Sequence, residues 1–456
     1  MARGFREIAW GARGFVDRIA RQAPARLALG VFASVIVVIT ALLAVPWATA
    51  TGHAAPFVDT LFTATSATTV TGLVVVPTGT YWSTYGLVVI LVAMQVGGFG
   101  VMTLASLLGL AVSRRLGLTQ KLLVSSETKV TRLGEVGSLV RTVIVTSTVL
   151  EVAIALVLFP RFLLDDEGAP RAAWHAVFYA VSSFNNAGFV PTEHGLVPYA
   201  SDWWVLLPIV VGVFIGSLGF PVILNVASRL REPRRWSLHS KLTITTSVAL
   251  VAAGTLLVGA FEWGNAFRGL SPSGHVLASL FAGVMPRSGG LSTVDVGSMH
   301  ESTWLVQDAL MFVGGGSAST AGGIKVTTLA VMLLAIVAEG RGDRDVEAYG
   351  KRIPRDTLQV AIAVSLISAT FVLICSLLLL AMTNLTLDRV LFEVISAFGT
   401  CGLSTGITAS LPTGAKYVLT VLMFIGRTGT ITVAAALALR NRRRVIRLPE
   451  ERPIIG

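Results

Sequence analysis

Residues 57–73 read FVDTLFTATSATTVTGL, an apolar stretch of about three helical turns that ends in a polar loop with a glycine. The same form returns in HAVFYAVSSFNNAGF at 175–189, HVLASLFAGVMPRSGGL at 275–291 and LDRVLFEVISAFGTCGL at 387–403. Each stretch is too short to cross a membrane, because a spanning helix needs roughly 20 apolar residues. Aligning the stretches on their last glycine brings four residues into one register: Gly72, Gly188, Gly290 and Gly402. The chain therefore repeats a unit of about a quarter of its length.

Long apolar runs flank each short stretch. They cover residues 27–47 and 85–112, 139–164 and 203–228, 242–261 and a broken run at 303–337, and finally 358–382 and 417–439. The 456-residue chain is 53% hydrophobic and only 13% charged, with a mean hydropathy of +0.74. This composition is typical of a polytopic membrane protein and excludes an ordinary soluble domain.

The basic residues lie in the gaps between pairs of long runs and at the two ends of the chain. They give a net charge of +11, but they do not form a single basic face, so we expect no nucleic-acid partner. Basic loops mark the cytoplasmic side of a membrane protein. The sequence thus predicts eight spans with both termini in the cytoplasm, and basic loops that could hold anionic membrane lipid or a protein partner.

The predicted fold is an all-α polytopic membrane protein. Its eight transmembrane helices form four pseudo-fourfold repeats of span, re-entrant pore helix, filter loop and span around one ion pore. The predicted segments are a cytoplasmic N-terminal segment at 1–26, pore repeats at 27–115, 116–235, 236–345 and 346–440, and a cytoplasmic tail at 441–456.

The four glycine-bearing loops suggest a cation pathway. Non-helical backbone at membrane depth survives only where protein or a water-filled cavity satisfies its polar groups. Four such loops around one axis form a ring of carbonyl dipoles, which replaces the hydration shell of a monovalent cation in potassium-channel filters. The loops read TVTGL, NNAGF, RSGGL and GTCGL, and none carries TVGYG. We therefore expect weaker discrimination than in a strict potassium channel.

The broken run at 303–337 contains GGGSASTAGGIK at 314–325. As one straight helix the run would measure about 52 Å, well beyond a hydrocarbon core of about 30 Å. A packing kink is one interpretation of the glycines. The other is a loop that bends into the cavity below the filter, where the hydroxyls of Ser317, Ser319 and Thr320 find partners or water.

Three basic residues are unusual for their positions. Arg287 lies inside the third glycine-bearing loop, where we expect it to hold loop carbonyls or a carboxylate such as Asp295 from behind. Arg427 lies about ten residues into the last span, where an arginine costs at least about 2.5–3.5 kcal/mol unless it is paired or hydrated. Lys325 follows the glycine-rich segment and is either part of a cation barrier or a snorkelling anchor.

The four repeats, the interrupted segment and the closing RLPEERPIIG resemble the potassium transporter superfamily of the Trk, Ktr and HKT membrane subunits. The resemblance is closest to the Ktr-type subunit, because no further pair of spans precedes the first repeat. It implies a homodimer in the cytoplasmic membrane with one potassium-selective pore per subunit and a cytosolic ring of regulatory subunits that bind nucleotide. K⁺ is the transported ion and Na⁺ a candidate activator, and the resemblance implies no cofactor on this chain.

The resemblance also assigns site residues. K⁺ would bind the backbone carbonyls of a filter made by Thr69, Val70, Thr71, Gly72, Asn185, Asn186, Ala187, Gly188, Arg287, Ser288, Gly289, Gly290, Gly399, Thr400, Cys401 and Gly402. A gate would comprise Gly314, Gly315, Gly316, Ser317, Ser319, Thr320, Gly322, Gly323, Lys325 and Arg427. Arg427 is expected to donate to carbonyls of the gate loop. Glycine at the first filter position, Gly72, resembles the potassium-selective members, whereas sodium-preferring plant relatives carry serine.

Two other functions are compared with the pore: an enzyme and a coupled transporter. The six histidines form no HExxH motif and no evident nucleophile pair, which argues against an enzyme. A sodium-coupled potassium secondary transporter stays open, because such proteins also use interrupted helices near the midplane. The chain has no Walker A motif, so any nucleotide control must come from another chain.

Overall fold

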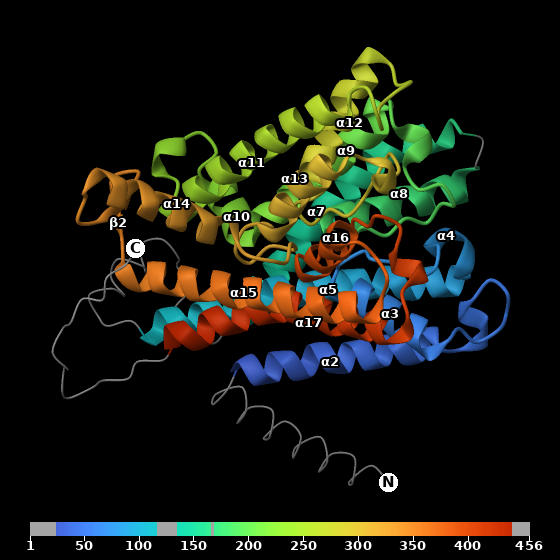
Figure 1. The fold of residues 1–456 in the computed structure, drawn as a ribbon, viewed down its shortest axis with the longest axis horizontal. Helices are drawn as coiled ribbons and strands as arrows, with labels where there is room; N and C mark the ends of the chain where they lie inside the picture. The colour runs from blue at the N-terminus through green and yellow to red at the C-terminus, as the bar shows by residue number, and fades with distance from the viewer. Residues whose placement is uncertain (1–23, 116–134, 166–167, 440–456) are drawn as a thin grey trace, which may run out of the picture.

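The computed structural model describes residues 24–115, 135–165 and 168–439, so most of the predicted N-terminal segment and the tail at 441–456 lie outside the described residues. Its long helices lie roughly side by side (Figure 1). They are α2 (Pro24–Leu43), α5 (Thr84–Arg115), α7 (Glu135–Leu163), α11 (Leu238–Glu262), α15 (Arg355–Met382) and α17 (Thr413–Leu439).

Four shorter helices coincide with the four aligned stretches of the sequence. They are α3 (Phe57–Thr68), α8 (Ala169–Phe184), α12 (Pro272–Val284) and α16 (Leu387–Phe398). Each packs against the long helix before it, as α3 does against α2 and α16 against α15. α3, α8 and α16 end directly before their glycine-bearing loops and α12 ends two residues before its loop, so the loops are held at the ends of buried helices.

The interrupted helix of the third repeat consists of α13 (Glu301–Phe312) and α14 (Val326–Arg341). Residues 313–325 between them form a non-helical segment, here called the interior loop, which is closed by an isolated parallel β-bridge between Val313 and Ile324. Its glycine-rich part is buried, with Ser317 half-buried. The break therefore falls where the sequence predicts it, and inside the protein.

The prediction of an unbroken span at 203–228 is wrong. Helix α9 (Trp203–Leu218) is followed by α10 (Phe220–Ser228) with a bend of 100° at Gly219. Gly219 has a φ of +94°, which is readily accessible only to glycine. The amide of Phe220 donates to the carbonyl of Ala318 at 3.1 Å, so the interior loop occupies the bend.

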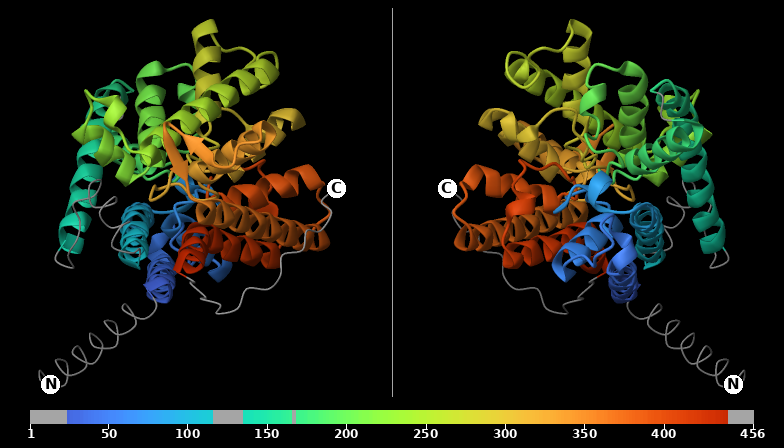
Figure 2. Two further views of the ribbon diagram at one scale, coloured as in Figure 1. Left: turned by 90° about the vertical axis from the view of Figure 1, so that its left-hand side faces the viewer. Right: turned by 90° about the vertical axis from the view of Figure 1, so that its right-hand side faces the viewer.

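The all-α prediction also misses a small antiparallel hairpin, drawn as two short arrows in Figure 2. Strand β1 (Val346–Ala348) pairs with β2 (Lys351–Ile353) through a turn at Tyr349 and Gly350, both with positive φ. The remaining elements are short: α4 (Thr78–Tyr81) and the 3-10 turns Pro46–Ala48, Val197–Tyr199, Pro233–Arg235, Val296–Ser298 and Thr408–Ser410.

The first and last quarters of the chain lie side by side. In Figures 1 and 2 the blue and the orange to red helices share one half of the molecule, and the green and yellow helices form the other half. Contacts of α17 with α2, α3 and α5 join the two ends of this arrangement. The first and last repeats are therefore neighbours in space.

Large apolar side chains cover the outside of the long helices. Val37, Leu156 and Leu366 are each more than 60% exposed. Three described helices are long and apolar enough to cross a membrane, at Val140–Leu163, Leu238–Glu262 and Arg355–Met382, and the bent α9–α10 pair would be a fourth. An apolar exterior of this extent marks contact with lipid. The number of eight spans stays a prediction.

Candidate functional site: four loops around one axis

The four glycine-bearing loops, here called loop 1 (69–72), loop 2 (185–188), loop 3 (287–290) and loop 4 (399–402), meet at their last glycines. A Cβ atom on Gly72 would lie 2.6 Å from the carbonyl oxygen of Ala187, and one on Gly188 would lie 3.2 Å from the Cα atoms of Gly72 and Gly290. On Gly290 it would collide with the carbonyl of Cys401, and on Gly402 with that of Thr71. The contacts close a ring that leaves no room for side chains.

The loops share one backbone pattern. Each last glycine has a positive φ, between 66° and 98°. Two residues earlier, a residue that is not glycine also has a positive φ: Val70, Asn186, Ser288 and Thr400. Such conformations cost about 1–3 kcal/mol each and persist only where the surroundings impose them. The sequence gives no signal for this second position, because its four residues differ in type and none is glycine.

Hydrogen bonds from loop amides to the short helices hold the conformation of loops 1 and 4. In loop 1 the amide of Thr71 donates to the carbonyl of Ser66 at 2.8 Å, and the amide of Gly72 donates to the Ser66 hydroxyl at 3.1 Å. Loop 4 repeats both bonds on Ser396, at 2.9 and 3.1 Å. With the amides turned toward the helix, the carbonyls are left to face elsewhere.

The carbonyls of Thr71, Ala187 and Cys401 each point at the glycine of a neighbouring loop. Within the described ranges, no protein donor pairs with these three carbonyls. Carbonyl oxygens that lie beside the four glycines without protein donors are suited to replacing the water around a cation such as K⁺.

Asp295 is one of the partners expected for Arg287 of loop 3 from the sequence, but the structure shows no hydrogen bond or ion pair between these two residues. The Arg287 guanidinium is 1% exposed and donates to the carbonyl and hydroxyl of Ser247 on α11, at 3.1 and 3.0 Å, and to the carbonyl of Gly314 at 3.3 Å. The Asp295 carboxylate instead accepts from the amide of Gly297. Arg287 thus connects loop 3 to the first residue of the glycine-rich segment.

The interior loop lies directly against the four-loop ring. The amide of Gly322 donates to the Ser288 hydroxyl of loop 3 at 3.3 Å, and a Cβ on Gly322 would collide with the Thr400 hydroxyl of loop 4. Thr320 donates its hydroxyl to the carbonyl of Phe184, next to loop 2, at 3.4 Å. The interior loop therefore contacts loops 3 and 4 and the end of α8 next to loop 2.

Two further cationic residues, Arg427 and Lys325, also donate to carbonyls of the interior loop. Arg427 on α17 is 1% exposed, and its Nη1 donates to the carbonyl of Thr320, the kind of contact that the sequence analysis expected. Its Nε and Nη2 have no partner within the part of the chain that the structure describes. The Lys325 ammonium donates to the carbonyl of Ala321 at 2.7 Å, so it points into the loop rather than outward as an anchor would.

A buried polar cluster behind loop 2 was not predicted. The Glu151 carboxylate of α7 accepts from the amide groups of Asn185, at 2.9 Å, and Gln95, at 2.7 Å. Asp308 on α13 and Glu393 on α16 are two further buried carboxylates in the apolar segments. The signal that identifies all three from sequence is an acidic residue inside a predicted span or pore helix.

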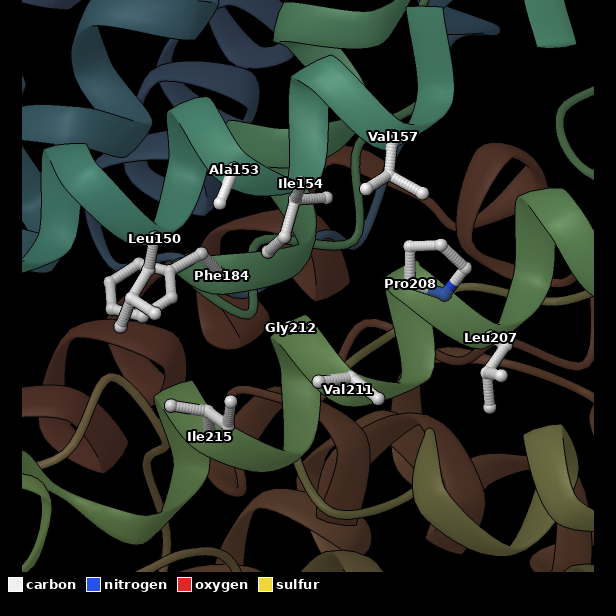
Figure 3. Close-up of a pocket in the computed structure, with 10 residues that line it drawn as sticks. All are labelled: Leu150, Ala153, Ile154, Val157, Phe184, Leu207, Pro208, Val211, Gly212 and Ile215. Carbon is white, nitrogen blue, oxygen red and sulfur yellow. The ribbon is translucent and has the colours of Figure 1, made fainter. Parts of the chain in front are cut away.

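An apolar cavity of about 340 Å³ lies on the outer side of loop 2, between α7 and α9 (Figure 3). Phe184, the last residue of α8, lines it together with Ile154 of α7 and Val211 of α9. None of the residues that line the cavity belongs to loops 1–4, so the cavity is separate from the ring of loops.

Known cation transport proteins are similar to this chain in sequence. Residues 30–443 match the family model of TrkH, a cation transport protein. The chain is 36% identical over 438 residues to "Ktr system potassium uptake protein B" of Bacillus subtilis, covering 95% of this chain and 96% of the relative. It is 29% identical to "Potassium/sodium uptake protein NtpJ" of Enterococcus hirae, covering 96% and 98%.

The fold is also similar to a solved structure. The crystal structure of the potassium transporter TrkH from Vibrio parahaemolyticus superimposes with a TM-score of 0.68 at 20% identity, over 88% of this chain and 83% of that one. The matched proteins transport cations and are not enzymes, which confirms that part of the sequence analysis. This chain belongs to the TrkH family of cation transport proteins.

Proposed function

We propose that the chain takes up potassium across the cytoplasmic membrane through a pore lined by the carbonyls of the four loops. The observation that carries the proposal is the closed ring of Gly72, Gly188, Gly290 and Gly402, with neighbouring carbonyls directed at it. It is supported by the 36% identity with potassium uptake protein B of Bacillus subtilis. Four span, pore-helix and loop repeats around one axis, eight spans in all, complete the proposed architecture.

The interior loop is proposed as the gate of this pore. It lies against the ring and is held by Arg427 and Arg287. A cation that passes the ring meets this loop and the buried positive charge of Arg427 next, which together make a steric and an electrostatic barrier. Moving the loop away from α9 and α17 would open the path.

The assembly around the chain is part of the proposal. A homodimer with both termini in the cytoplasm, and a cytosolic nucleotide-binding subunit that acts on the gate, fit the Ktr-type resemblance. The basic residues near the hairpin, such as Arg352 at the strand β2, provide a charged docking surface for such a subunit or for anionic lipid. The molecular mass of the purified protein in detergent tests the dimer.

Ion flux into proteoliposomes tests the function. The full-length chain, and the Arg427→Ala variant in case the wild-type gate is closed, would be supplied with Rb⁺ or Na⁺ under an imposed voltage. We expect saturable Rb⁺ uptake that exceeds Na⁺ uptake and needs no Na⁺. Strict dependence on Na⁺ would favour the coupled transporter, which the NtpJ relative makes a concrete alternative. Absence of Rb⁺ flux from both proteins would overturn the proposal.

A further inference from the structure

Glu393 is a fully buried carboxylate in the middle of α16. It accepts a hydrogen bond from the hydroxyl of Ser404, one from the amide of Thr405 at 3.2 Å and one from the hydroxyl of Thr408 at 3.0 Å. Three donors around two oxygens suit an ionised carboxylate, which only accepts hydrogen bonds. All three donors belong to the segment that leaves loop 4, so the carboxylate ties this segment to the pore helix.

The negative charge of Glu393 has no basic partner. In the described parts of the chain, the ion pairs join other residues, and no lysine, arginine or histidine pairs with this carboxylate. Buried charges are ordinarily paired or hydrogen-bonded because an isolated one is costly. Hydrogen bonds stabilise this one, and none of its hydrogen-bond partners among the described residues carries a positive charge.

The charge is close to the ring of loops. Ser404 binds the carboxylate and follows Gly402 by two residues, so their Cα atoms are at most about 7 Å apart. The interior loop contacts loop 4 at its first residues, where a Cβ on Gly322 would lie 2.9 Å from the carbonyl of Gly399. Glu393 therefore acts at the other end of loop 4, on the segment that leaves it. This segment, residues 402–408, is here called the distal end.

The residues at the same register in the other repeats allow the hydrogen-bonding role of Glu393 to be distinguished from the role of its charge. Glu393 stands nine positions before Gly402, and the residues in the same register are Thr63, Tyr179 and Phe281. The Tyr179 hydroxyl forms hydrogen bonds with the Thr192 hydroxyl at 2.7 Å and the Gly195 carbonyl at 3.2 Å, in the segment that leaves loop 2. Repeat 2 thus has a neutral tether where repeat 4 has a charged one.

We propose that Glu393 is a positioning residue for loop 4 that also makes the distal end of the ring attractive to K⁺. Its hydrogen bonds fix the segment that leaves the loop, and its unpaired negative charge lowers the energy of a cation held by the adjacent carbonyls. The inference rests on the proposed potassium pore, and it makes the four quarters of the ring electrostatically unequal.

The test compares three variants in proteoliposomes loaded for Rb⁺ uptake. Glu393→Gln keeps the size and removes the charge, and we expect the half-saturating Rb⁺ concentration to rise about tenfold while the maximal rate changes less than about twofold. Glu393→Asp keeps the charge on a shorter side chain. We expect a lower thermal midpoint of unfolding for it, with half-saturation within about twofold of wild type.

Tyr179→Phe is the matched control, since it removes a neutral tether at the same register. It should lower the thermal midpoint without changing half-saturation. An unchanged half-saturating concentration in Glu393→Gln, while wild type transports Rb⁺, overturns the inference and leaves the pore intact. If Glu393→Gln does not fold, a tenfold shift in Glu393→Asp would overturn it too, because the charge is retained there. Absence of transport by wild type and Arg427→Ala would instead overturn the proposed function.

Discussion

The most informative residues of the ring are not its glycines. Val70, Asn186, Ser288 and Thr400 occupy a left-handed conformation that L-residues avoid, and for Val70 the β-branched side chain makes it especially unfavourable. In loops 1 and 4 the same pair of hydrogen bonds, to the carbonyl and hydroxyl of Ser66 and of Ser396, holds this conformation. A conformation kept at four equivalent places despite its cost indicates that the direction of the carbonyls matters to function.

At the scale of one residue, Arg427 offers the sharpest test of the gate. Replacing Arg427 with alanine removes the hydrogen bond to the Thr320 carbonyl and a buried positive charge. A charged hydrogen bond contributes about 1.5–3 kcal/mol, so we expect Rb⁺ flux to rise about fivefold or more as the loop leaves its closed position. Uptake rates at equal protein density in proteoliposomes measure this.

Arg427→Lys is the control for charge. It keeps the cation but lacks the planar fork of the guanidinium, so we expect an intermediate flux. If alanine leaves the flux of the folded protein at the wild-type rate, Arg427 has no part in the gate.

At the scale of the element, the interior loop packs so closely against its neighbours that there is no room for a side chain at Gly316. A Cβ on Gly316 would collide with the Leu218 carbonyl and lie 2.9 Å from the Thr243 side chain, whereas Gly340 on α14 has nothing within 4 Å of such an atom. We therefore expect Gly316→Ala to push the loop from its seat and raise Rb⁺ flux, by about fivefold to thirtyfold for 1–2 kcal/mol of strain. Selectivity for Rb⁺ over Na⁺ should stay as in wild type.

Gly340→Ala is the matched control and should transport like wild type. Alanine in an open helical position adds stability rather than strain. A loss of selectivity in Gly316→Ala, instead of a gain in flux, would assign the interior loop to the filter and refute its role as the gate.

The sequence predicts this element well in position and poorly in its contacts. The break at 313–325 follows from local composition, because glycines and hydroxyl residues interrupt an apolar run. The bend at Gly219 has no such signal, since the Ala318 carbonyl that stabilises it lies about a hundred residues away in the chain. The same holds for Arg287, whose partner Gly314 comes from packing and not from spacing. Contacts to the backbone of residues far away in the chain could therefore not be predicted from a single sequence.

At the scale of the whole molecule, the buried acidic and basic side chains are kept apart. Glu151 and Glu393 are held by neutral donors beside the loops, and Asp308 is buried on α13. Arg287 and Arg427 instead bind backbone carbonyls of the interior loop. In the described ranges none of these five residues forms an ion pair with a residue of opposite charge. For the proposed pore, a cation would be attracted at the ring and opposed at the loop.

The ring also has to be closed between its first and last quarters, and one ion pair spans that junction. The Lys416 ammonium, near the start of α17, binds the Asp59 carboxylate in the first turn of α3 at 2.9 Å, with side chains only 13% and 16% exposed. Either Lys416→Met or Asp59→Asn should destabilise the fold by about 1–3 kcal/mol, between the values for exposed and buried pairs, and lower the thermal midpoint in detergent. Exchanging the two residues, as Asp59→Lys with Lys416→Asp, should recover part of the loss.

The exposed pair of Arg235 and Glu232, at the same distance of 2.9 Å but with side chains 73% and 52% exposed, provides the comparison. Arg235→Ala should leave the midpoint unchanged, because a solvated pair adds little stability. If the exchange is as unstable as the sum of the two single changes, the pair does not couple the quarters. Closure would then rest on the apolar packing of α17 against α3 and on the contact of Gly402 with the Thr71 carbonyl. Partial recovery in the exchanged protein, with Arg235→Ala neutral, would instead assign part of the closing energy to a single charge pair at the junction.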